Sequence, residues 1–175
     1  MRRGYVHVYT GNGKGKTTAM LGLALRAYGA ELKVYIGQFL KFGEYNEVKA
    51  IRKFLPDIVI EQYGDGYVVG APITRSHVES TKEGFQKAIS ALRSCKYDVV
   101  MLDEINIAIC LSILDIDDVL RMIEEKPEGI ELILTGRYAS REIMEAADLV
   151  SDIRAIKHYF YSGDEEGSAR DGIEK

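Results

Sequence analysis

The sequence has no tryptophan, three prolines and two cysteines among its 175 residues. Cys95 and Cys110 are too far apart for a CxxC motif and too few for a zinc ribbon or a disulfide scaffold. Apolar residues surround both, so we expect buried, reduced thiols. No apolar run reaches the roughly 18 residues of a membrane span, and no apolar segment follows Arg2 and Arg3 as in a signal peptide. These absences predict a cytoplasmic protein with no membrane partner.

Basic residues are fewer than acidic ones, since 23 lysines and arginines stand against 27 aspartates and glutamates, for a formal net charge of -4. Nucleic-acid-binding domains usually carry a basic excess, so no nucleic-acid partner is expected. The length corresponds to about one domain. We predict a single domain over residues 1–161 and a polar tail over 162–175, which holds five acidic and two basic residues.

Glycine, in contrast, is more frequent than average, with 17 residues, and β-rich runs alternate with segments of helical periodicity. Strands are expected over residues 5–9, 33–39, 58–63, 97–102, 131–135 and 153–160. Helices are expected over 17–28, 44–54, 76–94, the apolar stretch after 104, 115–126 and 140–147. Ser76 and Glu79 would form a capping box that leaves His77 in solvent, whereas His7 is expected to be a hydrogen-bonded structural histidine. This alternation predicts an α/β fold with a mainly parallel central sheet, which binds ligands at the carboxyl ends of its strands.

A glycine- and lysine-rich segment, which we call the phosphate loop, joins the first expected strand to the first expected helix. It consists of Gly11, Asn12, Gly13, Lys14, Gly15, Lys16, Thr17 and Thr18. Backbone N–H groups at a helix N-terminus can surround a phosphate, and glycines let the backbone come close. Lys16 would neutralise terminal phosphates and the Thr17 hydroxyl suits Mg²⁺. The usual motif has glycine where this chain has Thr10, so the loop is one residue shorter. Lys14 is either a phosphate contact or a solvated lysine.

An apolar strand ends in Asp103 and Glu104, as Walker B strands do. Asp103 would hold Mg²⁺ opposite Thr17, and its alternative is to cap the helix that follows. Glu104 would bind a nucleotide hydroxyl, assist the metal or favour the helix start. Arg137 either reaches the phosphates or forms a surface ion pair. The catalytic candidates are Lys16, Thr17 and Asp103.

Seven short segments, in order along the chain, match the motifs of one enzyme family. They are GNGKGKTT (11–18), QFLK (38–41), LDEIN (102–106), LTGR (134–137), ADLV (147–150), KH (157–158) and GIE (172–174). Together they resemble the CobA/BtuR-type ATP:corrinoid adenosyltransferases, also called cob(I)yrinic acid a,c-diamide adenosyltransferases. The phosphate loop and this resemblance refine the fold class to a P-loop NTPase-type, RecA-like three-layer fold, so residues 1–161 would be a nucleotide-binding domain.

The resemblance implies that ATP donates its 5′-deoxyadenosyl group to the Co(I) of a reduced corrinoid and leaves as triphosphate, in cobalamin biosynthesis or salvage. It also implies Mg²⁺, a homodimer, a flavoprotein-type reductase and ATP bound in reverse relative to ordinary P-loop enzymes. A P-loop ATPase, a small-molecule kinase and a non-catalytic nucleotide- or corrinoid-binding module stay open as alternatives.

The family's corrinoid-activating segment, G-x-G-F-T-W, reads GDGYVV over residues 64–69. In the family its aromatic residues help expel the lower axial ligand of cobalt. Here Tyr67 keeps an aromatic ring, while Val69 replaces the tryptophan. The resemblance thus implies corrinoid contacts at Tyr67 and Val69, with His158 a further candidate; an ordinary half-buried loop tyrosine is the alternative for Tyr67.

Overall fold

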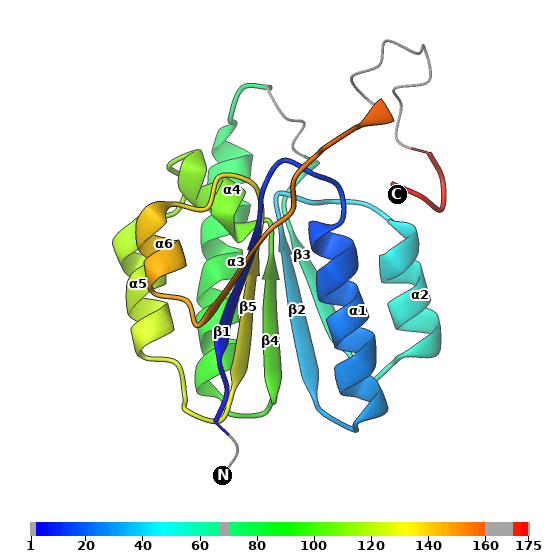
Figure 1. Ribbon diagram of the computed structural model, residues 1–175, viewed down its shortest axis with the longest axis vertical. Helices are drawn as coiled ribbons and strands as arrows, with labels where there is room; N and C mark the ends of the chain where they lie inside the picture. Colours follow the sequence, from blue (N-terminus) through cyan, green and yellow to red (C-terminus); the bar gives the residue numbers. More distant parts are fainter. Residues whose placement is uncertain (1–2, 67–70, 160–169, 175) are drawn as a thin grey trace.

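The structure is a computed structural model that describes residues 3–66, 71–159 and 170–174, so the predictions at Tyr67 and Val69 fall outside the described residues. Strands and helices alternate along most of the chain (Figure 1). The strands are β1 (Val6–Thr10), β2 (Val34–Phe39), β3 (Val59–Tyr63), β4 (Val99–Asp103), β5 (Glu131–Thr135) and β6 (Leu149–Asp152). The helices are α1 (Lys16–Gly29), α2 (Asn46–Phe54), α3 (Arg75–Arg93), α4 (Ile105–Cys110), α5 (Ile116–Glu124) and α6 (Arg141–Glu145).

The six strands form one sheet in the order β3-β2-β4-β5-β1-β6, and all five strand pairings are parallel. The apolar strands β2 and β4 are buried along their whole length, as expected for central strands covered on both faces. The edge strand β6 has mostly exposed residues. This topology confirms the predicted parallel sheet, and it brings the carboxyl ends of all six strands to one edge.

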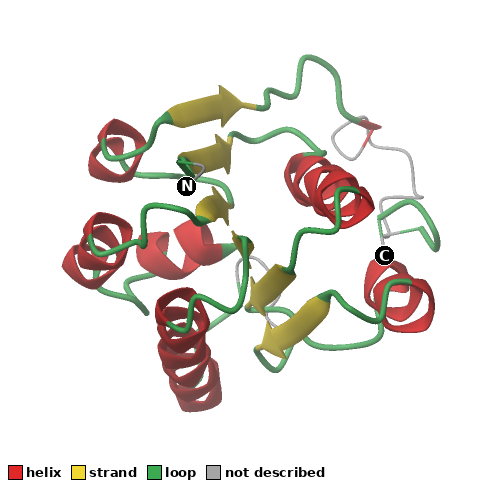
Figure 2. Cartoon of the chain, turned by 90° about the horizontal axis from the view of Figure 1, so that it is seen from below, coloured by secondary structure: helices red, strands yellow, loops and turns green. Residues whose placement is uncertain are grey.

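Helices cover both faces of the sheet (Figure 2). Helices α1 and α2 bury Met20, Ala24, Val48 and Ile51 against one face, and α3 to α6 bury Phe85, Leu92, Ile105, Val119 and Ile143 against the other. Successive residues of β4 alternate between the two cores: Met101 packs with α1, and Val100 and Leu102 pack with the opposite helices. The predicted three-layer arrangement is therefore confirmed. Within the described residues, no helix is long and apolar enough to span a bilayer.

The last strand lies earlier than the predicted range 153–160. The chain enters β6 soon after α6, and its residues pair with His7–Thr10 of β1. The Asp148 carboxylate accepts a hydrogen bond from the Val6 N–H at 2.8 Å, which fixes the start of this pairing. The segment after Asp152 leaves the sheet and runs beside the phosphate loop, where Ile153 N–H donates to the Thr10 carbonyl at 2.9 Å.

The start of α3 also differs from the prediction. Thr74 is the N-cap, and its hydroxyl accepts from the His77 N–H at 3.2 Å while the His77 ring accepts from the Thr74 N–H at 3.0 Å. The other ring nitrogen of His77 lies 2.5 Å from Asp65, and the residue is buried. The predicted Ser76 cap and the solvated His77 were wrong because an imidazole at the third helical position can do what glutamate does in a capping box.

Both cysteines are exposed, so the prediction of buried thiols was wrong. Cys95 follows the end of α3 with a positive φ of 52°, and Cys110 is the last residue of α4. Cys110 lies between the partly buried Ile109 and Leu111, whereas Cys95 lies between the exposed Ser94 and Lys96.

Candidate functional site

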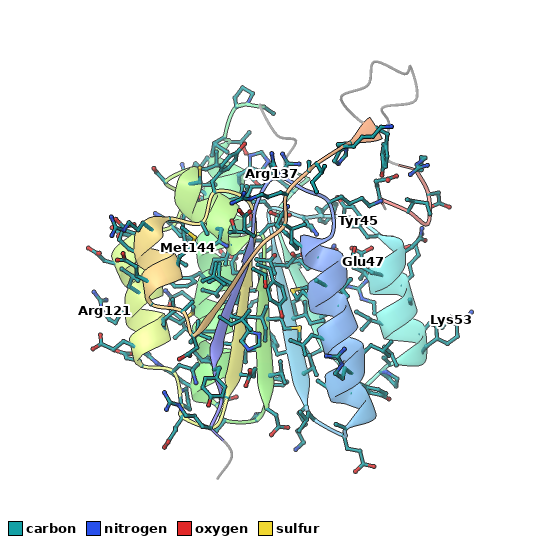
Figure 3. All side chains as sticks on the ribbon, in the orientation of Figure 1. Tyr45, Glu47, Lys53, Arg121, Arg137 and Met144 are labelled. Atoms are coloured by element: carbon teal, nitrogen blue, oxygen red, sulfur yellow. The ribbon has the colours of Figure 1, made fainter. Side chains whose placement is uncertain are left out.

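A cleft of about 570 Å³ opens at the carboxyl edge of the sheet, at the N-terminus of α1. Figure 3 shows Arg137 above the strand ends and Tyr45 and Glu47 at the top of α2, on the same side of the molecule. The predicted site residues that line it are Gly13, Lys14, Gly15, Lys16, Thr17, Thr18, Glu104, Arg137 and His158. Strand order explains the convergence, because β5 alone separates β1, which leads into the phosphate loop, from β4, which ends in Asp103.

The first half of the phosphate loop is fastened to the segment after β6. Gly13 N–H donates to the Ile153 carbonyl at 2.7 Å, and the Asn12 side chain accepts from the Ala155 N–H at 3.0 Å. Gly11 has a φ of 100°, and a Cβ there would lie 2.4 Å from the Ile153 oxygen. Gly11 and Asn12 therefore hold the loop in place and do not line the cleft, whereas the second half of the loop faces it.

Lys16 begins α1 and is buried at the base of the cleft. Its ammonium donates to the Gly13 carbonyl at 2.7 Å, so the side chain curls back under the loop. Burial lowers the pKa of Lys16, and the nearby positive charge of Arg137 acts in the same direction while Glu104 opposes both. The first turn of α1 contains no acidic residue and no side chain caps it in the described structure. The positive end of the helix dipole is thus open to an anion.

Asp103 is fully buried and accepts hydrogen bonds from four side chains on four different parts of the fold. Thr135 donates at 2.6 Å and Thr17 at 3.0 Å to one carboxylate oxygen, and Lys41 at 2.6 Å and Gln38 at 3.2 Å to the other. Burial alone would raise the pKa of Asp103, but the charge of Lys41 and these hydrogen bonds outweigh it and lower the pKa. The carboxylate is therefore ionised and held in one orientation.

Glu104, not Asp103, occupies the N-cap position of α4, so the alternative of helix capping by Asp103 was wrong. Glu104 has a left-handed backbone with a φ of 61°, and its N–H donates to the Thr135 hydroxyl at 3.1 Å. This strained turn directs its carboxyl group into the cleft. Burial, together with the charge of Asp103, raises the pKa of Glu104.

Lys14 lies on the rim of the cleft, and its side chain is exposed. Its ammonium is 2.7 Å from Glu174 and 3.1 Å from the Tyr159 hydroxyl. Glu174 also binds the Arg170 guanidinium at 3.1 Å. The predicted acidic tail thus contributes Gly172, Ile173 and Glu174 to the edge of the site, and the Glu174 carboxylate neutralises a lysine of the phosphate loop.

Arg137 follows β5 and a glycine of positive φ, and it lines the cleft near Lys16 and Glu104. Among the residues that the structure describes, it forms no salt bridge, so the surface ion pair proposed as an alternative is not seen. His158 lies on the same rim as the tail. His7 is a structural histidine as predicted, because its ring nitrogens contact Glu131 at 2.7 Å and the Tyr9 hydroxyl at 3.3 Å.

Three side chains around Asp103 were not among the predicted site residues, namely Lys41, Gln38 and Thr135. Each comes from the carboxyl end of a strand next to β4 in the sheet: Gln38 and Lys41 from β2 and the turn after it, Thr135 from β5. A signal for them was present, since all three fall in the QFLK and LTGR segments.

A larger cavity of about 990 Å³ lies between α3, α4 and α5 and includes Cys110 in its wall. No residue of the phosphate loop lines it, and neither do Asp103, Glu104 or Arg137. Charged side chains line both cavities, but the phosphate loop, Glu104 and Arg137 line only the smaller cleft, which is therefore the better candidate for the chemistry.

The residues of the cleft fit a hard divalent cation. The Thr17 hydroxyl and the Asp103 carboxylate are 3.0 Å apart, and Glu104 adds a second carboxyl group to the cleft. Mg²⁺ prefers such oxygen ligands and usually takes further ones from water and phosphates. Over the described ranges, no cluster of three or more histidine, cysteine or acidic side chains forms a metal site complete in itself.

Comparisons with known proteins identify the family and support the fold. A family model described as "ATP:corrinoid adenosyltransferase BtuR/CobO/CobP" matches residues 2–174. A "Corrinoid adenosyltransferase" of Escherichia coli is 34% identical over 165 residues, covering 92% of this chain and 82% of the relative. One of Pseudomonas aeruginosa is 32% identical over 162 residues, covering 92% and 80%. Among solved structures, a KaiC-like protein from Pyrococcus horikoshii matches with a TM-score of 0.53 at 19% identity, over 86% of this chain and 73% of that one, which supports the predicted P-loop NTPase-type fold.

Proposed function

The chain belongs to the ATP:corrinoid adenosyltransferase BtuR/CobO/CobP family, and from this premise we propose that it transfers the 5′-deoxyadenosyl group of ATP to the Co(I) of a reduced corrinoid and releases triphosphate. The observation that carries the proposal is one cleft in which the α1 N-terminus, three lysines and Arg137 meet the Thr17–Asp103 oxygen pair. Such a cleft suits a polyphosphate that must leave as an anion.

ATP would bind with its phosphates at the N-terminus of α1. Lys16 lies at the base of the cleft and Arg137 on its wall, so their charges would flank the polyphosphate. The open N–H groups of the first helical turn add hydrogen bonds without a change of conformation. We propose Lys14 as a further phosphate contact, once its carboxylate partner Glu174 gives way.

Thr17 and Asp103 are the residues that would hold Mg²⁺, and Glu104, which lines the same cleft, would bind a metal-bound water. The ion would supply positive charge to the triphosphate as it departs. Thr135 and Gln38 keep the Asp103 carboxylate in a fixed orientation. The Asp103 carboxylate is therefore oriented before substrate arrives, which lowers the cost of reorganisation during the reaction.

In the reaction, the Co(I) electron pair would form a Co–C bond to C5′ of ATP while the C5′–O bond breaks and its electrons leave with triphosphate. Co(I) is a strong nucleophile and needs no protein base to activate it. The work of the protein is to place C5′ in line with cobalt and to stabilise the departing charge through Lys16 and Arg137. The corrinoid would lie toward the loop after β3, where Tyr67 and Val69 occur in the sequence, with His158 a further candidate contact.

We infer from family membership that the enzyme works with Mg²⁺ as a cytoplasmic homodimer, in cobalamin biosynthesis or salvage, with a flavoprotein-type reductase as electron donor. A sedimentation measurement tests the dimer, and the reductase is not needed for the assay below.

The direct test is anaerobic incubation of the protein with MgATP and chemically reduced cobalamin or cobinamide. We expect a light-sensitive, adenosylated corrinoid together with triphosphate in equal amount. A phosphorylated acceptor or ADP with phosphate would instead indicate a kinase or an ATPase. ATP binding without either product would indicate a binding module.

A further inference from the structure

Lys41 contacts both side chains that would hold the metal. Its ammonium lies 2.6 Å from Asp103 Oδ2 and 3.3 Å from Thr17 Oγ1. The lysine side chain is 18% exposed and Asp103 is not exposed at all, so little water screens this pair. A single positive charge thus already touches the two oxygen groups that a divalent cation would bind.

Thr17 takes part in this contact through two hydrogen bonds. Its hydroxyl donates to Asp103 and accepts from Lys41, so the lone pair that faces the ammonium is in use. A metal ion bound between Thr17 and Asp103 would meet the ammonium at close range. Like charges at that distance in a poorly screened site repel strongly. The lysine and a divalent cation therefore exclude one another at these two residues.

The Lys41 ammonium can move to a second position within the cleft. It follows β2 in the turn after Leu40, and it lines the cleft together with the second half of the phosphate loop. Its ammonium lies 5.9 Å from the centre of the Tyr45 ring, and Tyr45 and Glu47 form the wall beside it. A change of side-chain rotamer within the cleft would bring the ammonium to an anion bound at the N-terminus of α1.

We propose that Lys41 is an exchangeable cation: it holds Asp103 and Thr17 in the empty site, yields them to the metal that arrives with ATP, and then binds the triphosphate. This inference rests on the proposed function. Metal alone must displace a bonded ammonium, whereas metal with a polyphosphate gives that ammonium a new anionic partner. Metal and nucleotide should therefore each raise the affinity of the protein for the other, and a large part of this coupling free energy should depend on Lys41.

The test measures Mn²⁺ binding by the electron paramagnetic resonance signal of the free ion, without corrinoid, in the presence and absence of inorganic triphosphate. Because triphosphate itself binds Mn²⁺, each titration with triphosphate is read against the same titration without protein. Lys41→Gln removes the charge but keeps a hydrogen-bond donor for Asp103. We expect its Mn²⁺ affinity without triphosphate to rise about tenfold, and its triphosphate affinity to fall about tenfold. Lys41→Arg keeps the charge and should retain the weak Mn²⁺ binding of the wild type.

Lys14→Gln is the matched control, because it removes a cation from the same cleft that has no hydrogen bond to Asp103. It should not raise Mn²⁺ affinity. The proposal is overturned if Lys41→Gln leaves Mn²⁺ affinity unchanged or lowers it, or if Lys14→Gln raises it equally. Should Lys41→Gln fail to fold, wild-type protein that binds Mn²⁺ as tightly without triphosphate as with it overturns the proposal. A wild type that binds no ATP would refute the proposed function instead.

Discussion

Two lysine–carboxylate pairs lie at opposite depths of one cleft. The inner pair joins Lys41 to Asp103 at 2.6 Å, and the outer pair joins Lys14 to Glu174 at 2.7 Å. Their distances are alike, but the inner side chains are 18% and 0% exposed, against 37% and 20% for the outer ones. Exposed pairs contribute little because water screens them, whereas a buried charge that loses its partner is costly.

The partners of the two carboxylates explain the difference further. Asp103 also accepts from side chains on β2, β5 and α1, so it fixes the geometry of several elements at once. Glu174 contacts Arg170 and Tyr159, which belong to the rim and to the chain end. The inner pair is thus part of the framework of the site, while the outer pair lies on its rim, where we expect a phosphate to replace the carboxylate without disturbing the fold.

The largest effect is expected from Asp103→Asn. The amide keeps the shape of the side chain but leaves Lys41 buried without its counter-charge, which should lower the free energy of unfolding by roughly 3 kcal/mol. Loss of the fixed carboxylate should also slow adenosylation by about 100-fold or more. Chemical denaturation and the rate of adenosylcorrinoid formation measure these two changes.

Glu174→Gln is the control for that substitution, because it makes the same change from acid to amide in the outer pair. It should leave the melting temperature unchanged. Equal destabilisation by both variants would contradict the distinction between framework and rim.

Lys16→Met should give the next largest effect, and on binding alone. Lys16 donates to a backbone carbonyl, and burial lowers its pKa, so a neutral side chain of similar length relieves the cost of burying a charge. Folding should therefore be little affected. ATP affinity should fall about 100-fold, since a charged hydrogen bond to phosphate is lost. Calorimetric titration with MgATP measures this, and unchanged affinity would show that the phosphates lie elsewhere.

Functional features that lie within one short segment of the chain could be predicted from the sequence. The phosphate loop and the acidic end of β4 are local patterns, and the alternation of strands and helices was enough to predict an α/β fold with a mainly parallel sheet. Thr17 and Asp103 lie 3.0 Å apart, as expected of residues at the carboxyl ends of parallel strands, because Asp103 ends β4 and Thr17 lies in α1 after β1.

Contacts that depend on the order of the strands in the sheet could not be predicted from the sequence. Lys41 and Thr135 reach Asp103 because β2 and β5 flank β4 in the sheet, and no spacing in the sequence states that neighbourhood. The contact of Glu174 with Lys14 joins residues near the two ends of the chain, and the composition of the tail predicted only its polarity. The exposure of Cys110 depends on where α4 ends, which apolar neighbours do not determine.

A smaller effect is expected in the pH dependence of stability, which tests the charge of the inner pair. The pKa of Asp103 is lowered in the folded protein relative to an unfolded value of about 3.9. Its contribution to stability is therefore complete above that value and is lost as the pH falls through the folded pKa. The gap in unfolding free energy between the wild type and Asp103→Asn, measured in chelator, should be constant near neutral pH and close below about pH 4. A gap that persists in acid would mean that the charge of Asp103 does not stabilise the fold.

The smallest effect, and the one that tests the outer pair directly, is the nucleotide affinity of Glu174→Gln. The contacts with Arg170 and Lys14 lower the pKa of Glu174, so at neutral pH it is an anion beside the phosphate loop and competes with phosphate for Lys14. Removing its charge should raise ATP affinity about two- to fivefold at low ionic strength, and the gain should shrink in high salt because the pair is exposed. Calorimetric titration at two salt concentrations measures both changes. The double variant with Lys14→Gln should show no gain, since the lysine that the carboxylate restrains is then absent. A gain that survives in the double variant would mean that Glu174 opposes ATP through the whole cleft and not through Lys14.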